Sequence, residues 1–252
     1  MNIRESITLS SRGDFVESAE WKKILFHIEL AVEMMEWPEG TGKFIAYDKV
    51  HGNGVKGITE MFARNLAQVG LSVKREHAIP DIGGDTPGDV DFIIETSGKP
   101  VAVEWETGNI SSAYRSMAKL CEYLRDGSVS AAVMILGDRK SSTRYFTDRI
   151  SSFDELKKHR PRYASYEYEE GVLQWVVYAI DGVSKDVPPF GKGEDGRAKE
   201  LKKAARRALK DLRSIDPDLF HKVMAKLDLH YDQIDLESDT EPQSPSTQSP
   251  LL

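Results

Sequence analysis

Three acidic residues, Asp91, Glu104 and Glu106, stand in two short apolar segments that a turn connects. Residues two apart on a strand point to the same side, so Glu104 and Glu106 project together, and a hairpin would bring Asp91 to their face. Crowded carboxylates repel one another unless a cation or a proton intervenes. Hard oxygen ligands suit Mg²⁺, which can activate water against a phosphodiester. Alternation alone also allows that Glu104 and Glu106 line the solvated face of an edge hairpin.

The surrounding sequence predicts the strands and helices that must position these carboxylates. Segments 90–95 and 101–106 flank a Ser-Gly-Lys-Pro turn, which predicts a β-hairpin. Helical spacing and capping patterns predict helices, and apolar runs predict further strands. The expected helices cover 18–36, 57–69, 111–125 and a segment from Ser152, and the expected strands cover 44–47, 131–136 and 173–180. This mixture indicates an α/β fold with a central mixed β-sheet flanked by helices.

The segment after the second strand resembles a known family. Residues 103–120 (VEWETGNISSAYRSMAKL) are similar to the catalytic strand and following helix of the BamHI-type restriction endonucleases. Further similar segments follow the family's order, and they are 37–38, 53–55, 75–76, 80–81, 90–92, 145–156 and 192–196. The resemblance covers roughly 19–200. It implies a restriction-endonuclease-like core of the PD-(D/E)xK nuclease superfamily, in which Glu106 stands where the superfamily usually has lysine.

The resemblance also implies roles for the acidic residues. Glu76, Asp91 and Glu104 would bind the metal ion, which we expect to be Mg²⁺, with Mn²⁺ as an alternative. Glu106 would position or deprotonate the attacking water, which requires hydrogen-bond reach to it. The expected activity is that of a type II restriction endonuclease, which hydrolyses double-stranded DNA to 5′-phosphate and 3′-hydroxyl ends.

The residues expected to read or contact DNA follow from the same resemblance. Those matching the family's major-groove readers are Asn109, Ser111, Arg115, Asp148 and Arg149. Arginine can donate two hydrogen bonds to guanine, and aspartate can accept one from cytosine. Because these positions agree in type, the implied target is GGATCC, cut after the first G.

Three further residues match other DNA-contacting positions of the family. Lys140 matches a basic position, and Gly193 with Asp195 matches a minor-groove segment. Ordinary explanations also remain open at these sites. Ser111 could cap its helix, Arg115 and Asp148 could pair on a solvated surface, and Lys140 could be a loop lysine.

The expected partner besides DNA is a second copy of the chain. Two-fold symmetry suits a palindromic site, and the resemblance places helix 111–125 and the helix from Ser152 at the dimer interface. A DNA-binding relative without cleavage is the second hypothesis. The joint presence of Asp91, Glu104 and Glu106 favours the enzyme.

Composition limits the remaining classes of function. The chain has 252 residues, a net charge of −7 and one cysteine, Cys121, which excludes a disulfide framework and a Cys-rich zinc site. No segment is long and apolar enough for a membrane span. These features predict a soluble intracellular protein. The resemblance implies a cytoplasmic protein of a prokaryotic cell with no small-molecule cofactor. The expected division is an endonuclease domain over 1–213, an accessory helical extension over 214–237 and a disordered tail over 238–252.

Overall fold

A computed structural model describes residues 1–77, 79, 88–140, 142–146, 150–191, 208–209 and 211–226. The chain forms two compact units, Met1–Gly193 and Glu194–Leu252. The second unit contains helix α7 (Pro217–Lys226), which lies within the span 214–237 predicted as a helical extension. Residues 192–207 and all of the predicted tail 238–252 lie outside the described residues.

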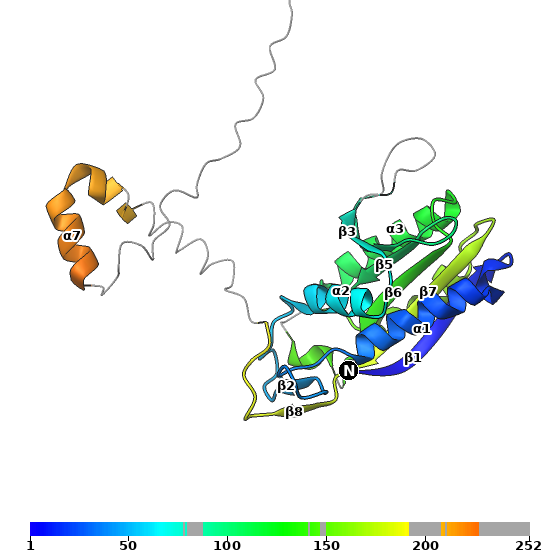
Figure 1. The fold of residues 1–252 in the computed structure, drawn as a ribbon, viewed down its shortest axis with the longest axis horizontal. Coiled ribbons are helices and arrows are strands. Elements are labelled where there is room, and N and C mark those ends of the chain that lie inside the picture. The colour runs from blue at the N-terminus through cyan, green and yellow to red at the C-terminus, as the bar shows by residue number, and fades with distance from the viewer. Residues whose placement is uncertain are drawn as a thin grey trace, which may run out of the picture. The chain divides into compact units, whose positions relative to one another are not determined.

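The first unit is built on a six-stranded sheet in the order β1-β7-β6-β5-β4-β3 (Figure 1). Its strands are β1 (Asn2–Arg12), β3 (Val73–His77), β4 (Val90–Ile94), β5 (Val101–Trp105), β6 (Ala131–Gly137) and β7 (Gly171–Ala179). Strands β5, β6 and β7 are parallel, whereas β1, β3 and β4 run antiparallel to their neighbours. The sheet is therefore mixed, as predicted, and the predicted hairpin is the β4–β5 pair.

Each face of the sheet has its own apolar core. Helices α1 (Ala19–Glu33) and α2 (Ile58–Gln68) cover one face (Figure 1), where Phe62 packs at 4.9 Å, between ring centres, from Trp105. Helix α3 (Ile110–Arg125) packs on the other face, where Met117 and Cys121 are buried with Trp175. These helices confirm the predicted ones to within a few residues. The core on the α3 side is the one that adjoins the acidic residues.

Shorter elements complete the first unit. Ser152 and Glu155 form the predicted capping box, with the Ser152 N–H donating to Glu155 Oε2 at 3.0 Å. The short helices are η1 (Phe15–Glu17), η2 (Thr143–Tyr145), α4 (Phe153–Leu156), η3 (Lys157–His159) and α5 (Arg160–Ala164). Strands β2 (Ile45–Tyr47) and β8 (Gly182–Ser184) form a separate parallel pair. Of the helices that the structure describes, none is both long and apolar enough to cross a membrane.

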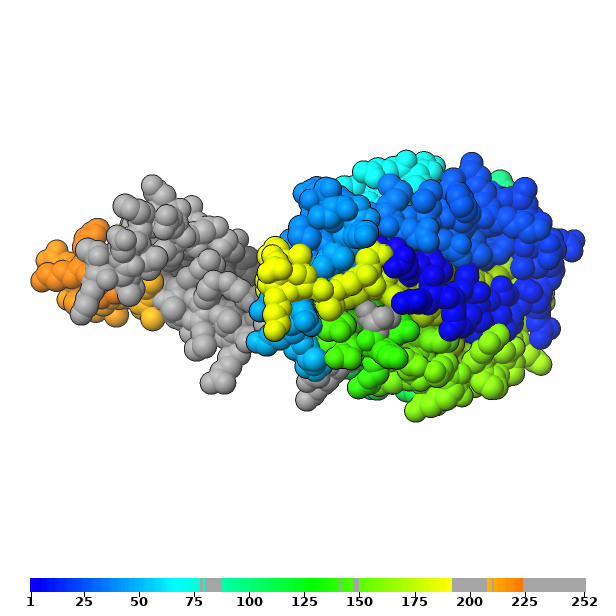
Figure 2. Space-filling view, turned by 90° about the horizontal axis from the view of Figure 1, so that it is seen from below, coloured from blue at the N-terminus to red at the C-terminus, as the bar shows by residue number. Residues whose placement is uncertain are grey.

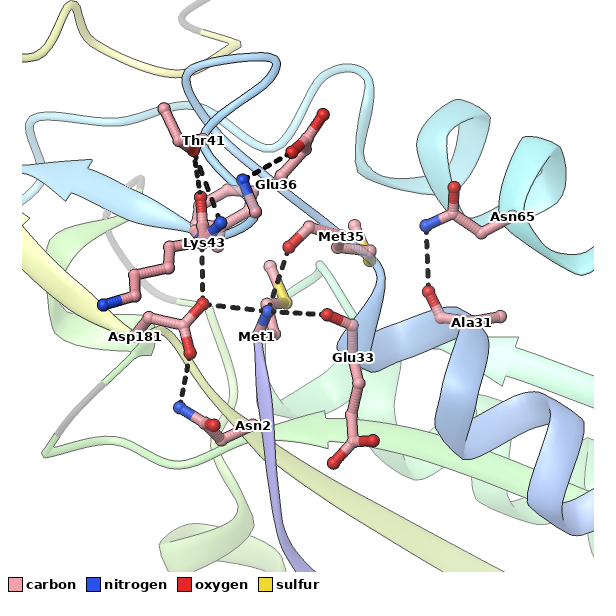
Figure 3. A network of polar contacts seen from close by, with 12 residues as sticks. Met1, Asn2, Ala31, Glu33, Met35, Glu36, Thr41, Lys43, Asn65 and Asp181 are labelled. Atoms are coloured by element: carbon pink, nitrogen blue, oxygen red, sulfur yellow. Dashed lines mark hydrogen bonds and ion pairs between the residues drawn. The ribbon is translucent and has the colours of Figure 1, made fainter.

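A polar network fixes the start of β1 to distant parts of the chain (Figure 3). The Met1 amino group lies 3.1 Å from Asp181 Oδ2 and donates to the Met35 carbonyl at 2.9 Å. Asn2 donates from Nδ2 to Asp181 Oδ1 at 2.5 Å. Figure 2 shows the dark-blue start of the chain beside the yellow residues near 180. Strand β1 is the edge strand on this side of the sheet, where it pairs with β7.

Candidate active site

The predicted metal-binding residues lie in a row across three neighbouring strands. The β3–β4 pairs Arg75–Phe92 and His77–Val90 place Glu76 opposite Asp91. The β4–β5 pair Phe92–Val103, continued by one residue, places Asp91 opposite Glu104. Directly opposed residues point to the same face of a sheet. Asp91 and Glu104 therefore share one face, which is the face covered by α3, and Glu76 lies beside Asp91 on the edge strand β3.

Two carboxylates of this row are largely removed from water. Glu104 is 6% exposed and Asp91 is half-buried, whereas Glu76 is exposed and has a positive φ of 45°. Burial, and secondly the charge of Asp91, raise the pKa of Glu104 from 4.5 to about 7. Burial also raises the pKa of Asp91, against the hydrogen bond that the Trp105 N–H donates to Asp91 Oδ2 at 2.8 Å. The negative charge of Glu76 adds to this increase in the pKa of Asp91.

Glu106 follows β5 and is also buried, with 5% exposure. Its Oε1 accepts the Gly108 N–H at 2.5 Å. Burial raises the pKa of Glu106 to about 7, against the effect of that hydrogen bond. The burial of Glu104 and Glu106 excludes the alternative in which they line a solvated hairpin face. Trp105 points to the opposite face and is core, at 2% exposure, as predicted.

Gly108 connects the segment after β5, which carries Glu106, to two other segments of the chain. Its carbonyl accepts the Ser151 N–H at 2.8 Å, two residues beyond the predicted reader Arg149. The next residue, Asn109, begins α3. A Cβ on Gly108 would lie 2.7 Å from the Ser112 Cβ, so the close approach requires glycine.

The first predicted DNA-reading residues lie on the opening turn of α3. Asn109 is the N-cap, and its Oδ1 accepts the N–H groups of Ser111 at 2.9 Å and of Ser112 at 3.1 Å. The suggestion that Ser111 caps the helix is therefore wrong, because Asn109 already satisfies these donors. Asn109, Ser111 and Arg115 are exposed, and Arg115 Nη2 lies 3.3 Å from Ser112 Oγ.

A groove of about 580 Å³ opens beside this helix start. Asn109 and Ser111 line it together with the cationic side chains of Arg139 and Arg144. Arg144 is exposed and stacks over Tyr145, with its Cζ 4.9 Å from the ring centre. Arg139 Nη1 lies 3.6 Å from Oε1 of Glu155, which also lines the groove. Sequence reasoning did not find Arg139 and Arg144, and their proximity to Asn109 becomes visible only through the fold.

Of the remaining predicted DNA contacts, Lys140 is exposed in the segment that follows β6. Asp148, Arg149, Gly193 and Asp195 lie outside the described residues, so the suggested Arg115–Asp148 pair is untested.

Lys119 is the main site residue that sequence reasoning missed. It projects from α3, forms an ion pair with Glu104 Oε1 and donates to the carbonyl of Asp89. Its charge opposes the increase in pKa of Asp91, Glu104 and Glu106. A lysine between apolar helix positions gives no local signal of such a contact.

The donor set suits a hard divalent cation chemically, because it consists of closely spaced carboxylates in a poorly hydrated place. Their oxygens are at present directed to partners within the chain, namely the Lys119 ammonium and the N–H groups of Trp105 and Gly108. Across the described part of the chain, no group of three His, Cys, Asp or Glu side chains is arranged to hold a metal ion as it stands. Ligation would therefore require some of these partners to be exchanged.

The chain is similar in sequence to known restriction enzymes. The chain is 34% identical over 175 residues to the type II restriction enzyme OkrAI of Oceanobacter kriegii, an alignment covering 69% of this chain and 89% of that enzyme. It is 35% identical over 118 residues to the type II restriction enzyme BamHI of Bacillus amyloliquefaciens, covering 46% of this chain and 52% of that enzyme.

A solved structure, restriction endonuclease BglII complexed with a DNA 16-mer, is similar with a TM-score of 0.44 and 15% identity, over 72% of this chain and 79% of that one. The family described as restriction endonuclease BamHI matches residues 1–197. The chain therefore belongs to the BamHI family of restriction endonucleases.

Proposed function

We propose that the chain is a Mg²⁺-dependent type II restriction endonuclease that cleaves double-stranded DNA at GGATCC after the first G. One observation supports this most strongly: the buried carboxylates Glu104 and Glu106 lead within three residues into the exposed, N-capped start of α3. Residues for hydrolysis and residues for reading bases thus occupy one continuous segment. A protein that only binds DNA has no need for buried carboxylates beside its reading helix.

The proposed division of labour follows the position of each carboxylate. Glu76, Asp91 and Glu104, in their row across the sheet, would hold the metal, and Mn²⁺ could replace Mg²⁺. Once bound, a divalent ion lowers the pKa of water and neutralises charge on a phosphoryl oxygen. Glu106 would orient the attacking water and accept its proton, a role that suits a carboxyl with a pKa of about 7.

The proposed DNA contacts surround the groove beside α3. Arg115 and Arg149 would donate to guanine, Asp148 would accept from cytosine, and Asn109 and Ser111 would contact neighbouring base edges. Lys140, Arg139 and Arg144 would bind phosphates, which position the duplex without reading it. Gly193 and Asp195 would meet the minor groove. A homodimer would present two such surfaces to the two halves of a palindrome.

The test is digestion of mixed-sequence plasmid DNA by the full chain, with mapping of the cut ends. We expect cuts only at GGATCC, with four-base 5′ overhangs, in Mg²⁺ or Mn²⁺ and none in EDTA. Glu106→Lys should abolish cutting and retain binding to a GGATCC duplex, whereas Glu39→Gln at an exposed position should cut normally. Ends at unrelated sequences would refute the proposed target, and cutting in EDTA would refute the metal requirement.

The second candidate is a DNA-binding relative that does not cleave. The same digest separates the two, because this candidate predicts binding at GGATCC with no cut in either metal. Analytical ultracentrifugation of the protein with a GGATCC duplex measures the mass of the complex and so tests the dimer. A complex of one chain with one duplex would contradict it.

A further inference from the structure

Lys119 occupies a position in the acidic cluster that the proposed reaction does not use. Its side chain is 17% exposed, and it projects from α3 towards strands β4 and β5. There its ammonium group contacts Glu104 Oε1 and the Asp89 carbonyl oxygen, two residues before Asp91. Both oxygens therefore lie close in sequence to, or belong to, the predicted metal ligands Asp91 and Glu104.

The charge balance of the cluster depends on this lysine. Among the described residues, no other Lys or Arg forms an ion pair with Asp91, Glu104 or Glu106. Its electrostatic influence extends to all three carboxyls, whereas that of Arg75 reaches Asp91 and that of Arg115 reaches Glu106. Buried carboxylates without a cation are costly, so Lys119 is the group that offsets their charge in the metal-free chain.

We propose that Lys119 is the resident cation of the acidic site, and that a divalent ion must displace its ammonium group from Glu104 in order to bind. This inference rests on the proposed function, because it takes Glu104 as a metal ligand. The ammonium group contacts Glu104 Oε1, which the divalent ion would need as a ligand. Two cations in a poorly hydrated site also repel each other, so contact of both with the Glu104 carboxylate is unfavourable.

The proposal makes a directional prediction for metal binding without DNA. Lys119→Met keeps most of the aliphatic stem and removes the competing charge. The full-length variant should therefore bind Mn²⁺ at pH 8 about tenfold more tightly than the unchanged chain, as measured by the spin-resonance signal of free Mn²⁺. Lys119→Arg keeps the competing charge and should therefore bind Mn²⁺ no more tightly than the unchanged chain. Equal or weaker binding by Lys119→Met, including no measurable binding by either protein, would overturn the proposal.

Two controls separate this proposal from the proposed function. Lys22→Met removes an exposed lysine paired with Glu17 and should leave Mn²⁺ affinity unchanged. Asp91→Asn should weaken Mn²⁺ binding to the chain. If Asp91→Asn has no effect, the proposed metal site is wrong; if it weakens binding but Lys119→Met does not strengthen it, only the displacement is wrong.

A measurement on the unchanged chain covers the case in which Lys119→Met does not fold. Amine-labelling followed by mass spectrometry should show Lys119 reacting several times faster in saturating Mg²⁺ than in EDTA, because the amine has left Glu104. Lys22 provides the internal reference on the same molecule. Equal labelling of Lys119 in the two conditions would contradict displacement.

Discussion

Replacing Glu106 by glutamine should stabilise the metal-free protein at alkaline pH. The Glu106 carboxyl is neutral at low pH in both the folded and the unfolded chain. Between pH 4.5 and about 7 the unfolded chain releases this proton while the folded chain keeps it, since burial raises the pKa of Glu106 to about 7. The free energy of unfolding therefore falls as the pH rises through this window, and the loss is complete above pH 7.

The size of the effect follows from the two pKa values. A change from 4.5 to about 7 corresponds to about 3 kcal/mol, because each pH unit is worth about 1.4 kcal/mol. Glutamine has no proton to release, and its Oε1 can still accept the Gly108 N–H that Glu106 accepts now. Glu106→Gln should therefore match the unchanged chain near pH 4.5 and exceed its stability by up to about 3 kcal/mol at pH 8.

Urea unfolding in EDTA, at both pH values, measures this difference. Glu39→Gln removes an exposed carboxyl and should change with pH as the unchanged chain does. Equal stability of Glu106→Gln and the unchanged chain at pH 8 would show that the folded protein does not destabilise the ionised form of Glu106.

Three further predictions test the fold and the DNA surface. Phe62→Ala should lower the free energy of unfolding by about 3–5 kcal/mol, because Phe62 of α2 is fully buried against Phe92 and Trp105 of the sheet. Phe26→Ala, at 59% exposure, should change it by less than about 0.5 kcal/mol in the same urea titration. Asn109→Ala should cost about 1 kcal/mol by removing the acceptor for two N–H groups of α3, and Asn109→Asp should not; equal stability of the two variants would contradict the cap. Arg144→Ala should reduce by about one the slope of log affinity against log salt for a GGATCC duplex, and an unchanged slope would remove Arg144 from the phosphate contacts.

The parts of the fold that follow from sequence are those where burial imposes a strong pattern. Strands β6 and β7 are apolar because neighbours cover both of their faces, and α1 and α2 show helical spacing because each has one buried face. Strand β1 was missed because it lies at an edge and most of its residues are exposed or half-buried. Strand β3 was missed for the same reason, since four of its five residues are exposed.

The candidate site was predictable only where its residues share a local pattern. The spacing of Glu104 on β5 and Glu106 just after it predicted a common face, and the structure confirms that both are buried. The ion pair of Lys119 with Glu104 joins a helix to a strand and so leaves no trace in local spacing. The choice between Asn109 and Ser111 as the cap depended on where α3 begins, which a sequence pattern locates only to within a residue or two.

The two hydrogen bonds of Gly108 have a consequence for fidelity. Its N–H holds the Glu106 carboxylate, and its carbonyl holds the backbone just beyond Arg149, while its successor anchors α3. Under the proposed function, a mismatched base that displaced the start of α3 would shift Gly108 and with it the Glu106 carboxylate. Base recognition and hydrolysis would then be coupled directly through the backbone of residues 106–109.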